Sequence, residues 1–80
     1  MDAGEQERRR KEAEALFVHR RVSITSKDFT EPVVLDVLSV EPNRGCPSTE
    51  LYSLHGTDAQ GGYPRAVGFW ERDTCINILE

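Results

Sequence analysis

The first eighteen residues form a highly charged segment whose composition is typical of a helix. Residues 2–17 contain no β-branched side chain and consist mostly of strong helix formers. Asp2 and Glu5 have the three-residue spacing of a capping box, which satisfies free amide groups at the start of a helix. The pattern therefore predicts a helix over residues 1–18.

The large apolar side chains of this segment gather at its far end instead of recurring every three or four residues, as they do in a helix with one buried face. They follow Ala13 and are Leu16, Phe17 and Val18. We therefore expect only the last turn to pack on the rest of the protein. The first two turns are expected to project into solvent, with contact to another chain as the alternative.

The rest of the chain alternates between short apolar segments and clusters of turn-forming residues. Residues 20–26 place Val22 and Ile24 on one face and polar side chains on the other, which is the period of a half-buried strand. Residues 33–40 are apolar on both faces except at Asp36 and Ser39, which predicts a central strand covered on both sides. Similar patterns predict further strands over residues 49–55, 65–70 and 74–79.

This order of elements predicts an α+β fold, with an N-terminal helix followed by a four- or five-stranded antiparallel meander. Antiparallel pairing is expected because parallel neighbours need longer crossover connections than this chain provides. The pattern leaves open whether the sheet stays open or curls toward a small barrel. Eighty residues are also the length of one small domain, here a helix over residues 1–18 and a sheet body over residues 20–80.

Composition and charge narrow the class of protein. Hydrophobic residues make up 38% of the chain, a value compatible with a globular domain. The formal net charge is −4, and residues 27–80 carry nine acidic and four basic side chains, so the folded body repels nucleic acid on average. No apolar run approaches the roughly 18 residues of a membrane span. The N-terminus also lacks the apolar stretch of a secretory signal.

These features lead us to expect a cytoplasmic protein without a membrane partner. Cys46 and Cys75 are then expected to be thiols, because the cytosol keeps cysteines reduced. The alternative, a disulfide between them, would need a secreted context that nothing in the sequence supports.

Residues 56–64, with the sequence GTDAQGGYP, form a longer connection than a tight hairpin requires. Gly56 and Gly61 have the spacing found in phosphate-binding loops, but the lysine and hydroxyl residue that should follow are missing. The glycines favour a flexible hairpin tip. The alternative is a tip that contacts another protein, with Tyr63 as its anchor.

The strand after this connection ends in Phe69 and Trp70, which must point to opposite faces of the sheet. If Phe69 faces the core, Trp70 lies on the other face. There it is either covered by Leu16 and Phe17 or exposed as an interface anchor. The sequence slightly favours the covered position.

The reactive side chains of the chain give little indication of metal binding or catalysis. The two histidines and two cysteines lack the close pairs that nucleate structural zinc sites, so no metal or other cofactor is expected. These residues are His19, Cys46, His55 and Cys75. Cys46 as a nucleophile with His55 as its base is the sharpest enzymatic hypothesis, since Arg44 is near in sequence and could favour the thiolate. Asp58 could also pair with His55, but no serine has an evident claim to be the attacking group.

Carboxylates recur at the predicted turns and strand ends, where they usually keep a protein soluble. They are Glu41, Glu50, Asp58, Glu71 and Asp73. The alternative is a negative face that imitates a nucleic-acid backbone and so inhibits a nucleic-acid-binding enzyme. Direct RNA binding would use stacking aromatic side chains beside basic ones, and the acidic body argues against it. The residues in question are Tyr52, Tyr63, Phe69, Trp70, Arg65 and Arg72.

The sequence therefore favours a small, non-enzymatic module that binds a partner protein through an aromatic loop and strand surface. The candidate binding residues are Asp58, Tyr63, Arg65, Trp70 and Glu71. The first alternative is the acidic inhibitor, and the second is an enzyme that uses Cys46. A meander also leaves two strand edges open, which would allow a weak homodimer.

Overall fold

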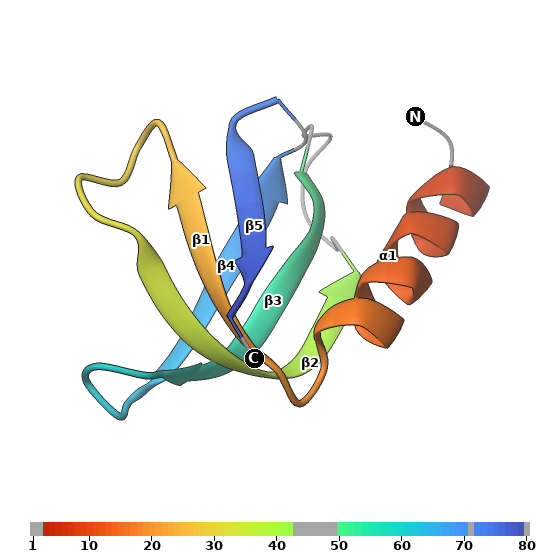
Figure 1. The fold of residues 1–80 in the computed structure, drawn as a ribbon. Helices are drawn as coiled ribbons and strands as arrows, with labels where there is room; N and C mark the ends of the chain where they lie inside the picture. Colours follow the sequence, from red (N-terminus) through yellow and green to blue (C-terminus); the bar gives the residue numbers. More distant parts are fainter. Residues whose placement is uncertain (1–2, 43–49, 71, 80) are drawn as a thin grey trace.

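The computed structural model describes residues 3–42, 50–70 and 72–79. In chain order its elements are α1 (Ala3–Phe17), β1 (Arg21–Ser26), β2 (Val33–Pro42), β3 (Glu50–Asp58), β4 (Pro64–Trp70) and β5 (Thr74–Ile78), as Figure 1 shows. The predicted α+β class, with one N-terminal helix and an antiparallel sheet, is confirmed. The helix is not long and apolar enough to cross a membrane.

The five strands form one sheet in the order β4-β3-β2-β1-β5. The first four strands are a meander, and β5 returns to pair antiparallel with β1. The short connection from β4 to β5 therefore joins the two edges of the sheet, which requires the sheet to curl strongly (Figure 1). The sheet is not closed into a barrel, because β4 and β5 do not pair within the described residues.

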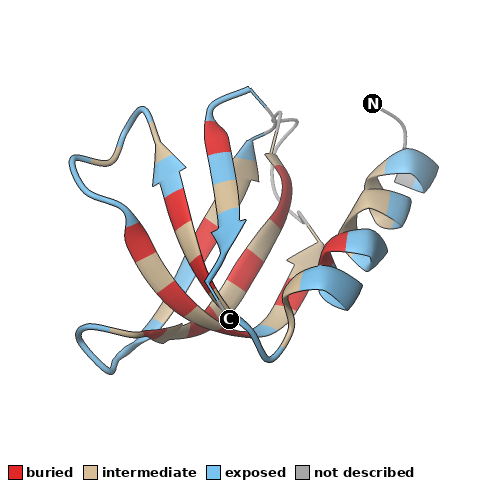
Figure 2. Ribbon diagram, viewed as in Figure 1, coloured by how far each residue is buried: buried red, intermediate tan, exposed pale blue. Residues whose placement is uncertain are grey.

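The hydrophobic core lies inside the curve of this sheet and follows from the alternation of each strand (Figure 2). Val22 and Ile24 of β1 are fully buried, as are Leu35 of β2 and Leu54 of β3. These residues are apolar, so removing them from water is the main favourable contribution to folding. The expected half-buried pattern of β1 is confirmed.

The central position of β2 is confirmed, but its coverage on both faces is not. Its buried residues alternate with more exposed ones, and Leu38 is 61% exposed on the outer face. Asp36 lies on the same outer face and accepts two hydrogen bonds from Arg21, at 2.7 and 3.1 Å. The pKa of the Asp36 carboxyl is lowered by this contact. Asp36, the polar residue that interrupts the apolar segment of β2, therefore lies on the more exposed face of this strand.

A β-bulge explains why Leu38 is exposed in the middle of the sheet. Val37 pairs with Gly56 and Ser39 pairs with His55, so Leu38 is an extra residue without a cross-strand partner. β3 approaches β2 so closely here that a Cβ atom at Gly56 would overlap the carbonyl oxygen of Asp36. Glycine is therefore required at this position.

Helix α1 packs against β2 and β3 through one narrow stripe. Ala13 is buried on this stripe, and Phe17 packs against the core one turn later. Nearer the N-terminus, Gln6 Nε2 donates a hydrogen bond to the backbone oxygen of Glu50 at 3.2 Å. The expectation that the first two turns project freely is therefore wrong, because polar side chains continue the contact where apolar ones are missing.

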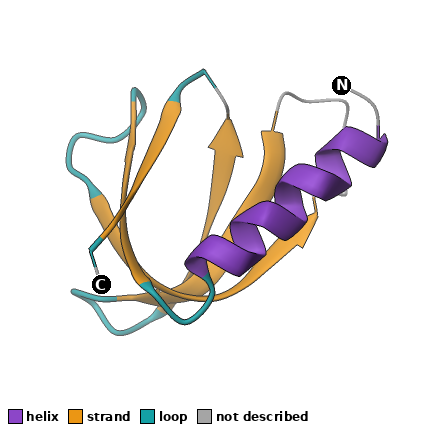
Figure 3. Ribbon diagram, turned by 45° about the vertical axis from the view of Figure 1, so that its right-hand side comes forward, coloured by secondary structure: helices purple, strands orange, loops and turns teal. Residues whose placement is uncertain are grey.

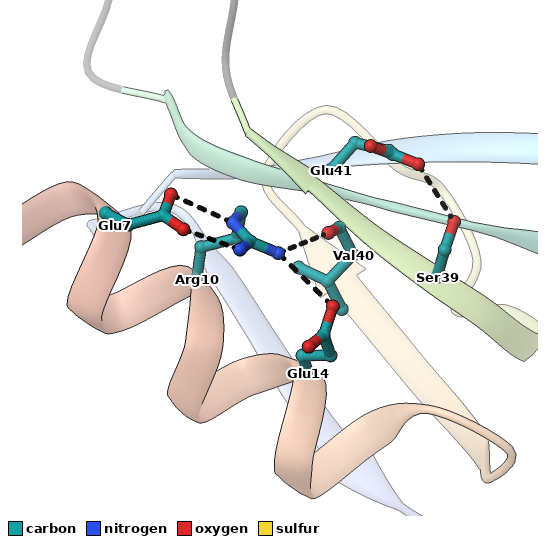
Figure 4. Close-up of polar contacts among 6 residues, drawn as sticks. All are labelled: Glu7, Arg10, Glu14, Ser39, Val40 and Glu41. Carbon is teal, nitrogen blue, oxygen red and sulfur yellow. Dashed lines mark hydrogen bonds and ion pairs between the residues drawn. The ribbon is translucent and has the colours of Figure 1, made fainter.

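Arg10 makes a polar contact between α1 and the sheet (Figure 4). Its guanidinium pairs with Glu7 at 2.6 Å and with Glu14 at 3.2 Å, and Nη1 also donates to the backbone oxygen of Val40 at 3.1 Å. The two carboxylates leave the guanidinium charge balanced although its side chain is only 15% exposed. Arg10 therefore joins the helix to β2 without leaving a buried charge unpaired.

Candidate functional site

The predicted binding residues fall into two groups at opposite ends of β4. Asp58, Tyr63 and Arg65 lie at the β3–β4 hairpin, whereas Trp70 is the last residue of β4. At the usual rise of a strand, six residue steps separate the two ends by about 20 Å. Glu71, the fifth candidate, lies outside the described residues. The candidate residues that can be placed therefore do not form a single cluster, and whether they bind a partner stays a prediction.

The hairpin is tighter than the sequence suggested. β3 continues to Asp58, so only residues 59–63 form the connection to β4. The backbone N–H of Asp58 donates to the carbonyl oxygen of Tyr63 at 2.9 Å, and that of Gly62 donates to Asp58 at 2.8 Å. Gly62 has a φ of 74°, a conformation that glycine adopts at little cost. The tip is therefore a hydrogen-bonded turn.

Asp58 holds this turn in shape. Its Oδ1 accepts hydrogen bonds from the backbone N–H groups of Gly61 at 2.8 Å and Gln60 at 2.9 Å. Its Oδ2 pairs with Arg65 at 3.2 Å, and the Asp58 side chain is only 9% exposed. The bond from Gly61 is the main reason that the pKa of Asp58 is lowered, with further contributions from Gln60, Arg65 and Tyr63 that together outweigh burial.

Tyr63 is exposed yet fixed in position. It is 49% exposed, and its ring lies so close over Gly61 that a Cβ atom there would overlap it. Arg65 Nη1 donates a hydrogen bond to the Tyr63 hydroxyl at 3.2 Å, and the same nitrogen pairs with Asp58. The aromatic side chain is thus held by the turn beneath it and by the arginine beside it.

These residues form one wall of a groove, which we call the loop groove. The β3–β4 hairpin faces the β1–β2 connection across it, and both connections lie on the side of the molecule away from α1 (Figures 1 and 3). Its volume of about 510 Å³ falls in the range of known ligand clefts. The groove is lined by Asp28, Phe29, Thr30, Glu31, Pro32, Val33, Val34, Asp58, Gln60, Gly61, Tyr63 and Arg65.

The β1–β2 connection contributes a mixed apolar and acidic wall that the sequence interpretation missed. Phe29 packs partly against the core, and Pro32 is exposed. Asp28 and Glu31 are also exposed. In sequence, the segment KDFTEP is one of the clusters that separate the predicted strands, and its aromatic residue within a polar turn is the signal for a contact surface.

Trp70 is not part of the core, contrary to the position that the sequence slightly favoured. It is 38% exposed on the outer face, where its ring lies over Gly68 near the Glu50 side chain. Its backbone N–H donates to Thr74 Oγ1 at 3.1 Å. The helix covers β2 and β3 instead, because its contacts with the sheet run along those two strands.

Of the two possible catalytic pairs, only Asp58 with His55 lies within the described residues, and the structure does not bring these two side chains together. His55 lies on the outer face of β3 and forms a hydrogen bond with Ser53 Oγ at 2.9 Å. The Asp58 carboxylate instead accepts a hydrogen bond from a backbone N–H group of the hairpin and pairs with Arg65. The proposed pairing of Asp58 with His55 is therefore wrong. Cys46 lies outside the described residues, so its pairing with His55 is untested, and Cys75 is an exposed thiol.

No group of three or more His, Cys, Asp or Glu side chains that could hold a metal ion occurs among the described residues. This covers three of the four residues weighed for zinc, since only Cys46 could not be placed.

Tyr52 and Phe69, two of the four aromatic residues considered for RNA stacking, pack against each other and against the core. Tyr52 is buried and stacks on Phe69 with a centroid distance of 4.9 Å and an interplanar angle of 8°. Burial raises the pKa of Tyr52 to about 12. Tyr52 is therefore inaccessible to a base, and one face of the partly buried Phe69 ring is covered by Tyr52.

The carboxylates that could imitate a nucleic acid are spread over the molecule. Asp58 pairs with Arg65, and Asp73 pairs with Lys27 at 3.3 Å. Glu41 and Glu50 lie at the far ends of β2 and β3 from the loop groove. The placed members of this set therefore do not form one continuous negative face.

Comparison with known proteins adds no assignment. The chain matches no protein-family model, no curated protein and no solved structure.

Proposed function

We propose that this protein is a non-enzymatic module that binds a partner protein through the loop groove, with Tyr63 as the anchor. The observation that carries the proposal is the geometry of Tyr63, which is half exposed but held by Gly61 and Arg65. Tyrosine supplies a large amphipathic contact area and is enriched among the residues that dominate binding energy.

Preorganisation is the physical reason for choosing this residue over other exposed aromatic side chains. Binding normally costs free energy because flexible side chains lose conformational freedom at the interface. The Tyr63 ring is already positioned by the turn that Asp58 builds, so less freedom is lost when a partner covers it. The groove beside the ring gives a partner side chain a place to insert.

The acidic inhibitor remains the alternative, but its supporting pattern is weak. Its carboxylates are separated in space, and two of those that can be placed are already paired with basic side chains. A surface that competes with nucleic acid needs a continuous negative potential. We therefore favour recognition by the groove.

Two matched variants test the proposal. Tyr63→Ala and Trp70→Ala each remove one exposed aromatic side chain, but from opposite ends of β4. The protein is immobilised and exposed to a nuclease-treated lysate of the source organism, and captured proteins are identified by mass spectrometry. Circular dichroism and NMR spectra establish that both variants remain folded.

We expect one dominant partner that is retained by Trp70→Ala and lost with Tyr63→Ala. Retention of that partner by folded Tyr63→Ala would overturn the proposal. If the partner were lost only with Trp70→Ala, the interface would lie at the other end of β4. Capture of nucleic acid in the absence of nuclease, with no protein partner, would contradict a protein-binding function.

A further inference from the structure

The loop groove combines aromatic walls with an excess of negative charge. The side chains that line the groove include three carboxylates and one guanidinium, so acidic groups outnumber basic groups there. Asp58 and Arg65 neutralise each other at 3.2 Å. The uncompensated charge therefore comes from the β1–β2 connection, where Asp28 and Glu31 lie.

Both of these carboxylates are available to a partner. Asp28 and Glu31 are exposed, and neither side chain forms an ion pair within the described ranges. The nearest lysine in sequence, Lys27, is directed to Asp73 at 3.3 Å and does not line the groove. No basic side chain of the groove is left to attract an anion, since Arg65 is held by Asp58 and Tyr63.

Apolar surface lies beside these charges. Phe29 and Pro32 line the groove from one side, and Tyr63 lines it from the other. A lysine or arginine side chain matches such a site, because its methylene groups pack on apolar surface while its charged end reaches carboxylates. Aromatic rings add a favourable interaction with a cation that lies over their faces.

We infer that the segment entering the loop groove is basic, with a lysine or arginine side chain that lies along Phe29 and Tyr63 and pairs with Asp28 or Glu31. This inference rests on the proposed function and specifies the chemistry of the partner. It excludes an acidic segment, which these carboxylates would repel.

A library of random peptides displayed on phage tests the inference with a defined probe. The wild-type protein is used for selection, and the affinities of enriched peptides are measured for three variants. Asp28→Asn with Glu31→Gln removes the charge of the groove. Glu12→Gln with Glu41→Gln removes the same charge from two side chains that do not line it. Tyr63→Ala removes the proposed anchor.

We expect the enriched peptides to share a lysine or arginine next to an apolar residue. Neutralising Asp28 and Glu31 should weaken binding by several-fold, up to about tenfold, because the basic side chain loses its ion pair and the attraction of the second carboxylate. The Glu12 and Glu41 control should leave affinity within about twofold of the wild type. Binding should also weaken as the salt concentration rises, because salt screens exposed charges.

The outcomes separate this inference from the function on which it rests. The enriched peptides could lack basic residues, bind equally well to Asp28→Asn with Glu31→Gln, and fail to bind Tyr63→Ala. That result would overturn the inference of a basic segment but would leave the groove as a binding site. Peptides that bind folded Tyr63→Ala unchanged would contradict the groove itself. Failure to enrich any peptide would overturn the inference, because a preorganised groove should select a short linear segment.

Discussion

At the scale of single residues, Asp58 is a buried carboxylate that holds neighbouring exposed residues in position. It accepts two backbone hydrogen bonds within the hairpin and pairs with Arg65, which in turn bonds to Tyr63. The sequence identified Asp58 as a residue that contacts a partner. In the structure, the Asp58 carboxylate is used within the hairpin, where it orients Arg65 and, through it, Tyr63, the residue that we propose as the anchor.

This network predicts a pH-dependent contribution to stability. The pKa of Asp58 in the folded protein lies below its ordinary value of 3.8, mainly because the Gly61 N–H stabilises the carboxylate. The stabilisation is fully present above the unfolded-state pKa and is lost as the pH falls through the lowered folded-state pKa. Asp58→Asn should therefore destabilise the protein at neutral pH, and its effect should shrink in acid.

Urea unfolding from neutral pH down to about pH 3 measures this difference. Asp28→Asn is the matched control, because it alters an exposed carboxylate of the same groove that forms no ion pair among the described residues. The control should follow the wild-type curve closely. A free-energy difference between wild type and Asp58→Asn that is independent of pH would contradict the role given to this carboxylate.

At the scale of elements, α1 shows why a helix can dock without an apolar face. Its existence was predicted from composition, and two of its ion pairs, Arg8 with Glu12 and Arg10 with Glu14, occur at the expected spacing. The docking of its last turn was predicted, but that of its earlier turns was not, because Arg10 belongs to the charged pattern in sequence but reaches a backbone oxygen of β2 in space. Hydrophobic periodicity cannot detect a contact made by such polar groups.

Two alanines two residues apart test this docking. Ala13 is 3% exposed against the sheet, whereas Ala15 is exposed. Ala13→Leu should destabilise the protein by about 1–3 kcal/mol, because the larger side chain has no room beneath the helix. Ala15→Leu should change stability by no more than about 0.5 kcal/mol.

Thermal and urea denaturation of both variants provide the measurement. Leucine and alanine both favour helices, so differences in helix propensity contribute little. Equal effects at the two positions would show that α1 does not pack along the stripe that includes Ala13.

At the scale of the whole molecule, the strand order depends on the curl of the sheet. A simple meander would place β5 beside β4 and leave β1 at an edge, yet β5 pairs with β1 through residues such as Ser23 and Asn77. The fully buried side chains of Val22 and Ile24 fit this arrangement, because β1 then lies between two strands.

Hydrogen exchange measured by NMR checks the order directly. Amides along β1 should exchange as slowly as those of β2 and β3, since neighbours accept hydrogen bonds from β1 on both sides. Amides that point outward from β4 and β5 should exchange faster. Rapid exchange at every second residue of β1, without a cross-strand Overhauser effect between Ser23 and Asn77, would contradict the pairing of β5 with β1. It would indicate a simple meander with β1 at an edge.

The sequence by itself determined the identity of the elements, because helix propensity and hydrophobic alternation are local properties that each segment carries alone. It also identified Tyr63 as an anchor candidate from the turn residues around it. Tertiary structure decided which segments meet. The pairing of β5 with β1 and the approach of Phe29 to the hairpin both depend on the curvature of the sheet. That curvature arises from packing between residues distant in sequence, which no single segment encodes.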